Sequence, residues 1–139
     1  LPLQPTQPGL FWYGIHAAEM LYRVLGTGCE SVHTAATEFH DVLTAVWKDG
    51  RIGTIRGNRA GNDRFGITIH RTEVSSFVDI MEHSKPYYAS LLDQIMQMFT
   101  TGVSGVPLSE TLEIIRFLEA ANVSRETGET VRLDGYNMA

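Results

Sequence analysis

The residue best suited to proton chemistry is His16, which stands between an aromatic segment and a helical pattern. Phe11, Trp12 and Tyr13 precede it, and the apolar spacing of a helix begins at Ala17. The N-terminal end of a helix favours a neutral imidazole over the charged imidazolium. A neutral imidazole can accept or donate a proton near neutral pH. His16 is therefore a candidate catalytic residue; the alternative is a hydrogen-bonded histidine beneath the aromatic cluster.

The sequence contains few groups of residues that could bind a metal ion together. His16 and Glu19 lie three residues apart, and Glu38 and His40 lie two apart. Two ligands do not make a site, because a protein metal centre needs three or four. Cys29 is the only cysteine, so no disulfide can form within one chain. We predict no metal site, and we expect the other histidines at the surface or in hydrogen bonds: His33, His70 and His83.

A turn that could hold a dinucleotide is also missing from the sequence. Gly26-Thr27-Gly28 lacks a third glycine and follows a helical pattern, whereas the dinucleotide fingerprint follows a strand and opens a helix. Neither a phosphate-binding loop ending in Gly-Lys nor a Gly-x-Ser-x-Gly motif occurs. We therefore expect no cofactor bound to this chain by itself.

Positive charge is concentrated in one segment of an acidic chain. The net charge is −5, yet residues 48–71 contain six basic residues against two acidic ones. This strip could contact phosphate or carboxylate, and the alternative is a pair of strands with solvated arginines. A nucleic-acid-binding protein is usually basic over the whole domain, so we predict no nucleic-acid partner.

The length and composition indicate one globular domain. The chain has 139 residues, of which 43% are hydrophobic and 19% charged, and it has no apolar run long enough for a transmembrane helix. We therefore predict a soluble protein, with its compartment open between cytoplasm and periplasm. The sequence begins at Leu1 without a signal-peptide pattern, and we expect it to be part of a longer polypeptide.

The first half of the chain reads as an arm, a helix and a series of strands. Residues 1–9 contain three prolines and are expected to form an extended arm or linker, followed by one domain over 10–139. A helix ends before Gly26. Five segments rich in Val, Ile, Thr and Phe then predict strands: 31–38, 41–47, 51–59, 65–71 and 75–81. Asp49-Gly50 predicts a tight hairpin, and the short spacing favours an antiparallel meander.

The second half is mainly helical. Apolar residues at i, i+3, i+4 and i+7 from Tyr88 predict an amphipathic helix that ends at Gly102. A further helix is predicted with Ser109 as N-cap, with Gly128 as its stop, and with an apolar face formed by Leu112, Ile115, Leu118 and Ala121. Residues 131–133 predict a short strand. The fold class is therefore α+β, with helices on one face of an open, mostly antiparallel sheet. The other face is expected to meet another domain or subunit.

The order of these pieces resembles a known family of enzymes. The resemblance rests on Phe-Trp-Tyr-Gly-Ile-His-Ala-Ala-Glu-Met-Leu at 11–21, Gly-Thr-Gly at 26–28, Val-Trp-Lys-Asp-Gly-Arg-Ile-Gly-Thr at 46–54, and the segment from Pro107 to Ser124. It spans about residues 10–133. The chain is similar to the C-terminal domain of the Gfo/Idh/MocA oxidoreductases, the relatives of glucose–fructose oxidoreductase and inositol dehydrogenase.

The resemblance implies an enzyme of two domains. An N-terminal Rossmann domain, absent here, would hold NAD or NADP. The C-terminal α+β domain would bind a carbohydrate-like substrate and build a homodimer or a higher homo-oligomer. The reaction of the family moves a hydride between nicotinamide and a carbon that bears a hydroxyl in a sugar or cyclitol. This chain by itself is therefore expected to be inactive.

The resemblance also implies roles for single residues. His16 matches the histidine that assists proton transfer with the substrate hydroxyl. The family often has an aspartate four residues earlier, where this chain has Trp12, and Glu19 stands where an aspartate is common. Trp12 and Tyr13 are candidates to stack on a sugar ring, and their alternative role is core or interdomain packing.

The sequence thus favours the substrate-binding and oligomerisation domain of an NAD(P)-dependent oxidoreductase. A second hypothesis is a non-catalytic binding or assembly module of the same fold, which the loss of the aspartate at Trp12 favours. A third is an anion-binding or nucleic-acid-binding module that uses the basic strip at 48–71. It would show steep salt dependence. We expect the uncovered sheet face to form a dimer.

Overall fold

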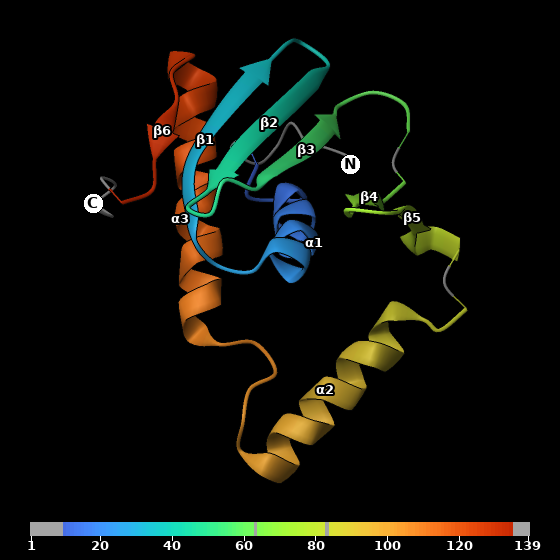
Figure 1. Ribbon diagram of the computed structural model, residues 1–139. Helices are drawn as coiled ribbons and strands as arrows, with labels where there is room; N and C mark the ends of the chain where they lie inside the picture. The colour runs from blue at the N-terminus through green and yellow to red at the C-terminus, as the bar shows by residue number, and fades with distance from the viewer. Residues whose placement is uncertain (1–9, 63, 83, 135–139) are drawn as a thin grey trace.

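The described helices and strands follow the predicted order (Figure 1). The computed structural model describes residues 10–62, 64–82 and 84–134, so the predicted arm at 1–9 and His83 lie outside the described residues. The elements are α1 (Gly14–Leu25), β1 (Cys29–Ala36), β2 (His40–Trp47), β3 (Ile52–Asn58), β4 (Gly66–His70), β5 (Ser75–Asp79), a 3₁₀ turn (Ile80–Glu82), α2 (Tyr87–Thr101), α3 (Leu108–Thr127) and β6 (Val131–Arg132). The prediction of an α+β fold is confirmed.

Four strands form one antiparallel sheet in the order β3-β2-β1-β6, and β4 and β5 form a separate hairpin. The predicted meander is therefore correct for β1 to β3 and wrong at β4, which does not pair with β3. The Asn58 side-chain amide donates to the carbonyl oxygens of Ala60 and Asn62, at 2.9 and 2.8 Å. These bonds fold the connection back on itself, and β4 starts beside α1 instead of along the edge of β3.

The hairpin between β2 and β3 has the predicted turn. Gly50 has φ of +86°, a region that a side chain makes costly, and its N–H donates to the Trp47 carbonyl. The Asp49 carboxylate accepts hydrogen bonds from the Arg51 backbone N–H and guanidinium, at 3.1 and 2.8 Å. These bonds hold the pKa of Asp49 below its ordinary value.

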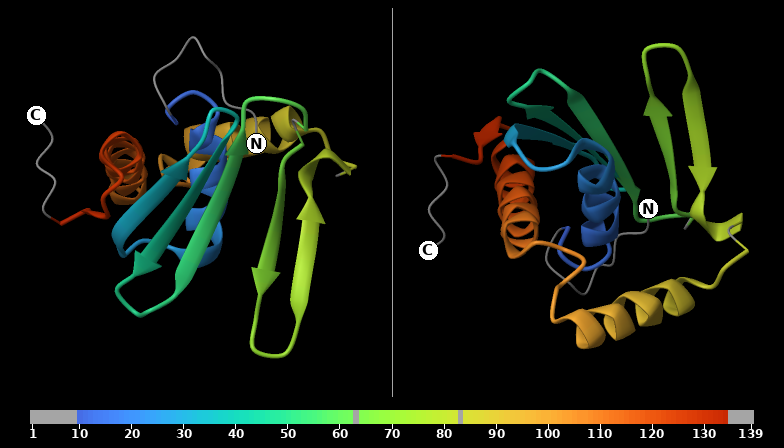
Figure 2. Two further views of the ribbon diagram at one scale, coloured as in Figure 1. Left: turned by 90° about the horizontal axis from the view of Figure 1, so that it is seen from above. Right: turned by 60° about the horizontal axis from the view of Figure 1, so that its bottom comes forward.

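The core lies between the four-stranded sheet and the two helices α1 and α3. Leu43, Ala45 and Trp47 of β2 point into it, whereas Val42 is 40% exposed on the opposite face. The ring of Tyr22 lies 5.6 Å from that of Trp47 and 5.8 Å from that of Phe117, so one aromatic cluster joins α1, β2 and α3. The prediction of helices on one face thus holds for α1 and α3 (Figure 2).

A glycine sets how closely α1 approaches the sheet. A Cβ atom on Gly53 of β3 would lie 2.6 Å from the Leu21 Cδ1 atom and 2.9 Å from the Leu25 Cδ1 atom. Such distances are far below van der Waals contact. Glycine at this position therefore lets α1 pack against β3.

The predicted cap of α3 is wrong, and its predicted apolar face is correct in part, because Leu118 and Ala121 are buried but Leu112 and Ile115 are not. The helix begins at Leu108 after Pro107, whose φ of −62° suits a helix start, and no side chain caps it. The buried face comprises Ile114, Phe117, Leu118, Ala120, Ala121 and Ser124, while Leu112 is 40% exposed and Ile115 half-buried. Polar contacts fix this rotation, because the Thr34 N–H donates to Ser124 Oγ and the Thr34 hydroxyl donates to the Ala121 carbonyl, both at 2.9 Å.

The helix α2 forms as predicted but packs differently. It ends at Gly102, which has φ of +71° and donates its N–H to the Met98 carbonyl. None of its residues is buried, so the predicted apolar face is uncovered by the described residues. No described helix is both long and apolar enough to cross a membrane.

A buried polar cluster ties the end of α1 to β1 and α3. Glu113 Oε1 accepts the backbone N–H groups of Gly28 and Cys29, at 2.7 and 2.9 Å. The Tyr22 hydroxyl is buried beside Cys29 and Glu113 without a hydrogen bond of regular geometry. Burial, together with the nearby Glu113 charge, raises the pKa of the Cys29 thiol to about 12. Burial also raises the pKa of Tyr22 far above its usual value.

These shifts predict that the fold is sensitive to alkali. Below about pH 8 both groups are protonated in the folded and the unfolded chain. Above it, the unfolded thiol releases a proton that folded Cys29 keeps up to about pH 12, so stability falls by up to about 1.4 kcal/mol per pH unit. Urea unfolding at pH 8 to 11 measures the slope. Cys29→Ala should make the fall of stability with pH less steep from about pH 9 upward. Tyr22→Phe, as a separate variant, should make it less steep above about pH 10. Equal slopes in all three proteins would contradict this assignment.

Candidate functional site

His16 lies on the first turn of α1, as the sequence predicts. Its Nδ1 atom is 3.5 Å from Glu19 Oε2, and both side chains are a little over half exposed. The spacing of three residues along the helix brings these two side chains onto one face. If Nδ1 carries the proton toward Glu19, Nε2 is left as an acceptor for an incoming hydroxyl. Among the described residues, no group of three or more possible metal ligands forms around this pair or elsewhere.

Aromatic rings surround His16 in a continuous series. The ring centre of Tyr13 lies 6.1 Å from Trp12 and 5.9 Å from His16, in edge-to-face geometry. Phe65, which precedes β4, lies 6.0 Å from His16 and 6.5 Å from Tyr13. The structure thus brings the three predicted site residues together and adds Phe65. Sequence reasoning missed Phe65, because no local pattern relates a residue before β4 to the start of α1.

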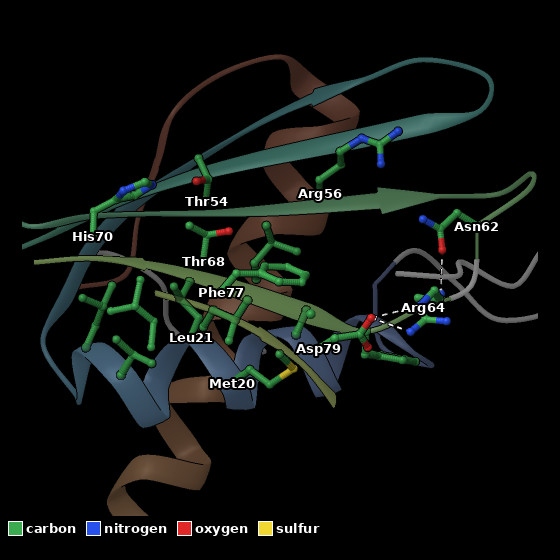
Figure 3. A pocket seen from close by; sticks show the side chains of 18 of the residues that line it. Met20, Leu21, Thr54, Arg56, Asn62, Arg64, Thr68, His70, Phe77 and Asp79 are labelled. Atoms are coloured by element: carbon green, nitrogen blue, oxygen red, sulfur yellow. Dashed lines mark hydrogen bonds and ion pairs between the residues drawn. The ribbon is translucent and has the colours of Figure 1, made fainter. Parts of the chain in front are cut away.

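A pocket of about 580 Å³ opens next to this series (Figure 3). It runs along α1 and is walled by β3 on one side and by the β4–β5 hairpin on the other. Ala17 and Phe65 belong to its lining, whereas His16, Trp12 and Tyr13 do not. Phe65 thus lines the pocket and also contacts the His16 ring, so it links the pocket to the aromatic series.

The pocket has an apolar side and polar ends. Met20, Leu21 and Leu25 of α1 supply the apolar side. Figure 3 shows Asn62, Arg64 and Asp79 at one end and His70 at the other. Such a mixture suits a ligand with several hydroxyl groups on an apolar frame.

An ion pair organises the polar end near Phe65. Arg64 Nε and Nη2 donate to Asp79 Oδ2, at 3.0 and 2.5 Å, and Nη2 also lies 3.2 Å from Glu82 Oε1. The Arg64 hydrogen bonds hold the pKa of Asp79 below its ordinary value. Both charged groups are therefore in place beside the pocket.

Three of the six basic residues at 48–71 form ion pairs with carboxylates of the described chain. Arg51 contacts Asp49, Arg59 contacts the buried Asp41, and Arg64 contacts Asp79. The alternation of the strand places Arg56 on the exposed side of β3, at the rim of the pocket. The arginines thus serve several separate local contacts.

The glycine turn at 26–28 does not have the form of a dinucleotide-binding turn. The Gly26-Thr27-Gly28 turn follows α1 and leads into β1, which is the reverse of the strand-to-helix order of a phosphate-binding turn. Glu113 occupies the backbone N–H groups of Gly28 and Cys29, so these donors are not free for phosphate oxygens.

Comparison with known proteins identifies the fold at low sequence identity. No family model and no curated protein matches the sequence. The structure is similar to a protein described as a dehydrogenase from Thermotoga maritima, with a TM-score of 0.78, 18% identity, and coverage of 97% of this chain and 55% of the other. It is also similar to one described as an NADPH-dependent oxidoreductase from Desulfitobacterium hafniense, with a TM-score of 0.72, 14% identity, and coverage of 94% and 49%.

A third similar structure carries ligands. It is the WlbA dehydrogenase from Bordetella pertussis in complex with NADH and UDP-GlcNAcA, with a TM-score of 0.67, 17% identity, and coverage of 94% and 46%. The chain thus has a fold found in oxidoreductases and spans about half the length of the solved chains it matches.

Proposed function

We propose that this chain is the substrate-binding and oligomerisation domain of an NAD(P)-dependent oxidoreductase that acts on a sugar or cyclitol hydroxyl. The observation that carries the proposal is the His16–Glu19 pair, set among aromatic rings beside a pocket of about 580 Å³. The oxidoreductase fold and the resemblance to the C-terminal domain of the Gfo/Idh/MocA enzymes support it.

Each residue of the proposed site has a distinct task. His16 Nε2 takes the proton of the substrate hydroxyl on oxidation and returns it on reduction. Glu19 is a positioning residue, because a carboxylate at Nδ1 selects the imidazole tautomer with Nε2 free. The exposed face of Trp12 and the ring of Tyr13 offer apolar surfaces to the C–H groups of a sugar ring. The polar end at Asn62 and Arg64 suits its hydroxyls.

The proposal assigns NAD or NADP to a nucleotide-binding domain N-terminal to these residues. The turn at 26–28 does not fit the phosphates of the cofactor, while two of the similar proteins are NADPH-dependent by name or hold NADH. The partners proposed for this domain are thus its own nucleotide-binding domain, a carbohydrate-like small molecule and a second copy of the chain.

Spectroscopy on the natural full-length gene product tests the function. The change in absorbance on NAD(P)H formation is followed with NAD or NADP and a panel of sugars, cyclitols and nucleotide sugars. We expect turnover with a subset of these substrates. A full-length product that binds neither dinucleotide would contradict the proposal.

The alternative is a non-catalytic binding or assembly module of the same fold. Trp12 favours it, since the matching position in the family often carries an aspartate that could polarise the catalytic group. Binding of a sugar to the full-length product, measured by calorimetry, without turnover of any substrate with either dinucleotide would favour this alternative.

We further predict a dimer through the sheet face opposite α1 and α3. This face carries Val42 and Ile52, which are 40% and 65% exposed, among outward residues that include Thr44 and Thr54. Val42→Glu places a carboxylate on this face beside Arg56, its cross-strand neighbour on β3. It should convert the dimer to a monomer, because taking both charges out of water is costly. Light scattering measures the mass. A parent chain that is monomeric at high concentration would refute the prediction.

A further inference from the structure

The helix α2 exposes a series of large apolar side chains. Its large side chains are exposed along the whole helix; those more than half exposed are Tyr87, Tyr88, Leu91, Leu92, Met96 and Phe99. We call these residues the α2 surface. The segment that follows continues it, with Val103 and Leu108 about 70% exposed. Soluble monomers seldom expose contiguous apolar patches of this kind, so another surface must cover it.

The charge pattern of α2 points to extensive burial in the complete protein. Asp93 is the only charged residue among its fifteen, and Lys85 from outside the helix neutralises it, with Nζ 2.6 Å from Oδ2. A solvent-facing helix normally carries charged residues on its polar side. Nearly uncharged helices are typical of protein interiors and permanent interfaces.

The position of α2 indicates what covers it. Figure 2 shows α2 on the side of the sheet that carries α1 and α3, set apart from both. His16 on the first turn of α1 belongs to this side, whereas the exposed side chains Val42 and Ile52 belong to the opposite face. The three solved chains described above each match 94–97% of this chain, and the matched part is only about half of each solved chain.

We propose that the α2 surface docks a second domain of the same polypeptide, held against the α1 side of the sheet by apolar contacts. The identity of that domain as the nucleotide-binding one rests on the proposed function. In this arrangement the docked domain lies between α2 and α1, on the side where His16 can meet a substrate. The opposite sheet face stays available to a second copy.

A paired substitution in the natural full-length gene product tests the docking. Leu92 and Phe99 are seven residues apart on one face of α2 and are 59% and 73% exposed. The double variant Leu92→Glu/Phe99→Glu keeps good helix formers in α2. It removes no buried side chain, because none of the residues of α2 is buried among the described residues. We expect the parent to melt in one calorimetric transition and the variant in two. We also expect proteolysis of the peptide joining the domains to be at least tenfold faster in the variant.

The matched control carries the same change on the opposite face. Val42→Glu/Ile52→Glu should leave one melting transition and the parental proteolysis rate, and should instead reduce the mass measured by light scattering. Circular dichroism of each variant checks that the secondary structure is retained.

Three results would overturn the docking. They are unchanged melting and proteolysis in the α2 variant, loss of dimer mass in that variant without separation of domains, and a natural product no longer than this chain. The second would assign α2 to a second copy. Failure of the proposed function looks different: the α2 variant separates two domains, but the parent binds no dinucleotide.

Discussion

Replacing His16 with alanine is expected to lower kcat of the natural full-length protein by about 10²- to 10⁴-fold, with a much smaller change in KM. A positioned general acid or base contributes about this much to a reaction that moves a proton. His16 contacts Tyr13 and Phe65 only through ring edges and is half exposed, so its removal leaves the core intact. The loss should therefore appear in turnover and not in stability.

Two further variants test whether the loss of turnover comes from the loss of proton transfer by His16 or from the removal of any histidine. Glu19→Gln keeps a side chain of the same size but removes the charge 3.5 Å from Nδ1, and should reduce kcat by less than His16→Ala does. His40→Ala removes an exposed histidine that lies outside the pocket lining and should leave kcat unchanged. Steady-state kinetics by absorbance of NAD(P)H measures all three. A loss below threefold in His16→Ala would remove His16 from the chemistry.

Replacing Trp12 distinguishes between the two roles proposed for its exposed ring. If its exposed ring stacks on a sugar, Trp12→Ala should raise KM with little change in kcat, because stacking acts equally on bound substrate and transition state. If the ring instead packs against another domain, Trp12→Ala should weaken the contact between the domains, seen as separate melting transitions, and should leave KM unchanged.

Local patterns in the sequence predicted where most helices and strands begin and end, but they did not predict how these elements pack against one another. Gly50, Gly102 and Gly128 mark a turn and two helix ends in the predicted places, because positive φ is a property of one residue. The rotation of α3 depends on Thr34 meeting Ser124 across 90 residues, and no periodicity contains that contact.

The candidate site likewise combines residues that a local pattern predicts with one residue that only a long-range contact brings in. His16, Trp12 and Tyr13 lie within five residues of one another, so the sequence could predict them as a group. Phe65 joins them only because Asn58 folds the connection to β4 back toward α1. The predicted apolar face of α2 was correct as a pattern, but what covers it depends on a surface outside the described residues.

The buried carboxylate of Asp41 is expected to contribute strongly to the stability of the fold. It is fully buried, and its oxygens accept two hydrogen bonds from the Arg59 guanidinium, at 3.1 and 2.8 Å. Arg125 Nε on α3 lies 3.1 Å from Oδ2, as an ion pair outside regular hydrogen-bond geometry. One carboxylate thus joins the start of β2, the end of β3 and the last turns of α3.

Asp41→Asn is therefore expected to lower the free energy of unfolding by about 3–5 kcal/mol. The substitution keeps the shape of the side chain but leaves two partly buried guanidinium groups without their counter-charge, and breaking a buried pair costs this much. Urea unfolding with an unchanged m-value measures it. Asp49→Asn is the matched control, because the Asp49–Arg51 pair has the same chemistry on the surface, where about half of each side chain is exposed.

Comparison of Asp41→Asn with Asp49→Asn shows whether the loss of stability comes from the burial of the ion pair or from the loss of one negative charge. Exposed ion pairs contribute little, so Asp49→Asn should leave the urea midpoint close to that of the parent. If both variants lost stability equally, loss of charge alone would explain the result. If neither did, water must reach Asp41 and replace its partners. A large loss in Asp41→Asn only would show that the contact among β2, β3 and α3 depends on a carboxylate removed from solvent. It would also explain why Arg59, in the middle of the basic strip, is not available to an external anion.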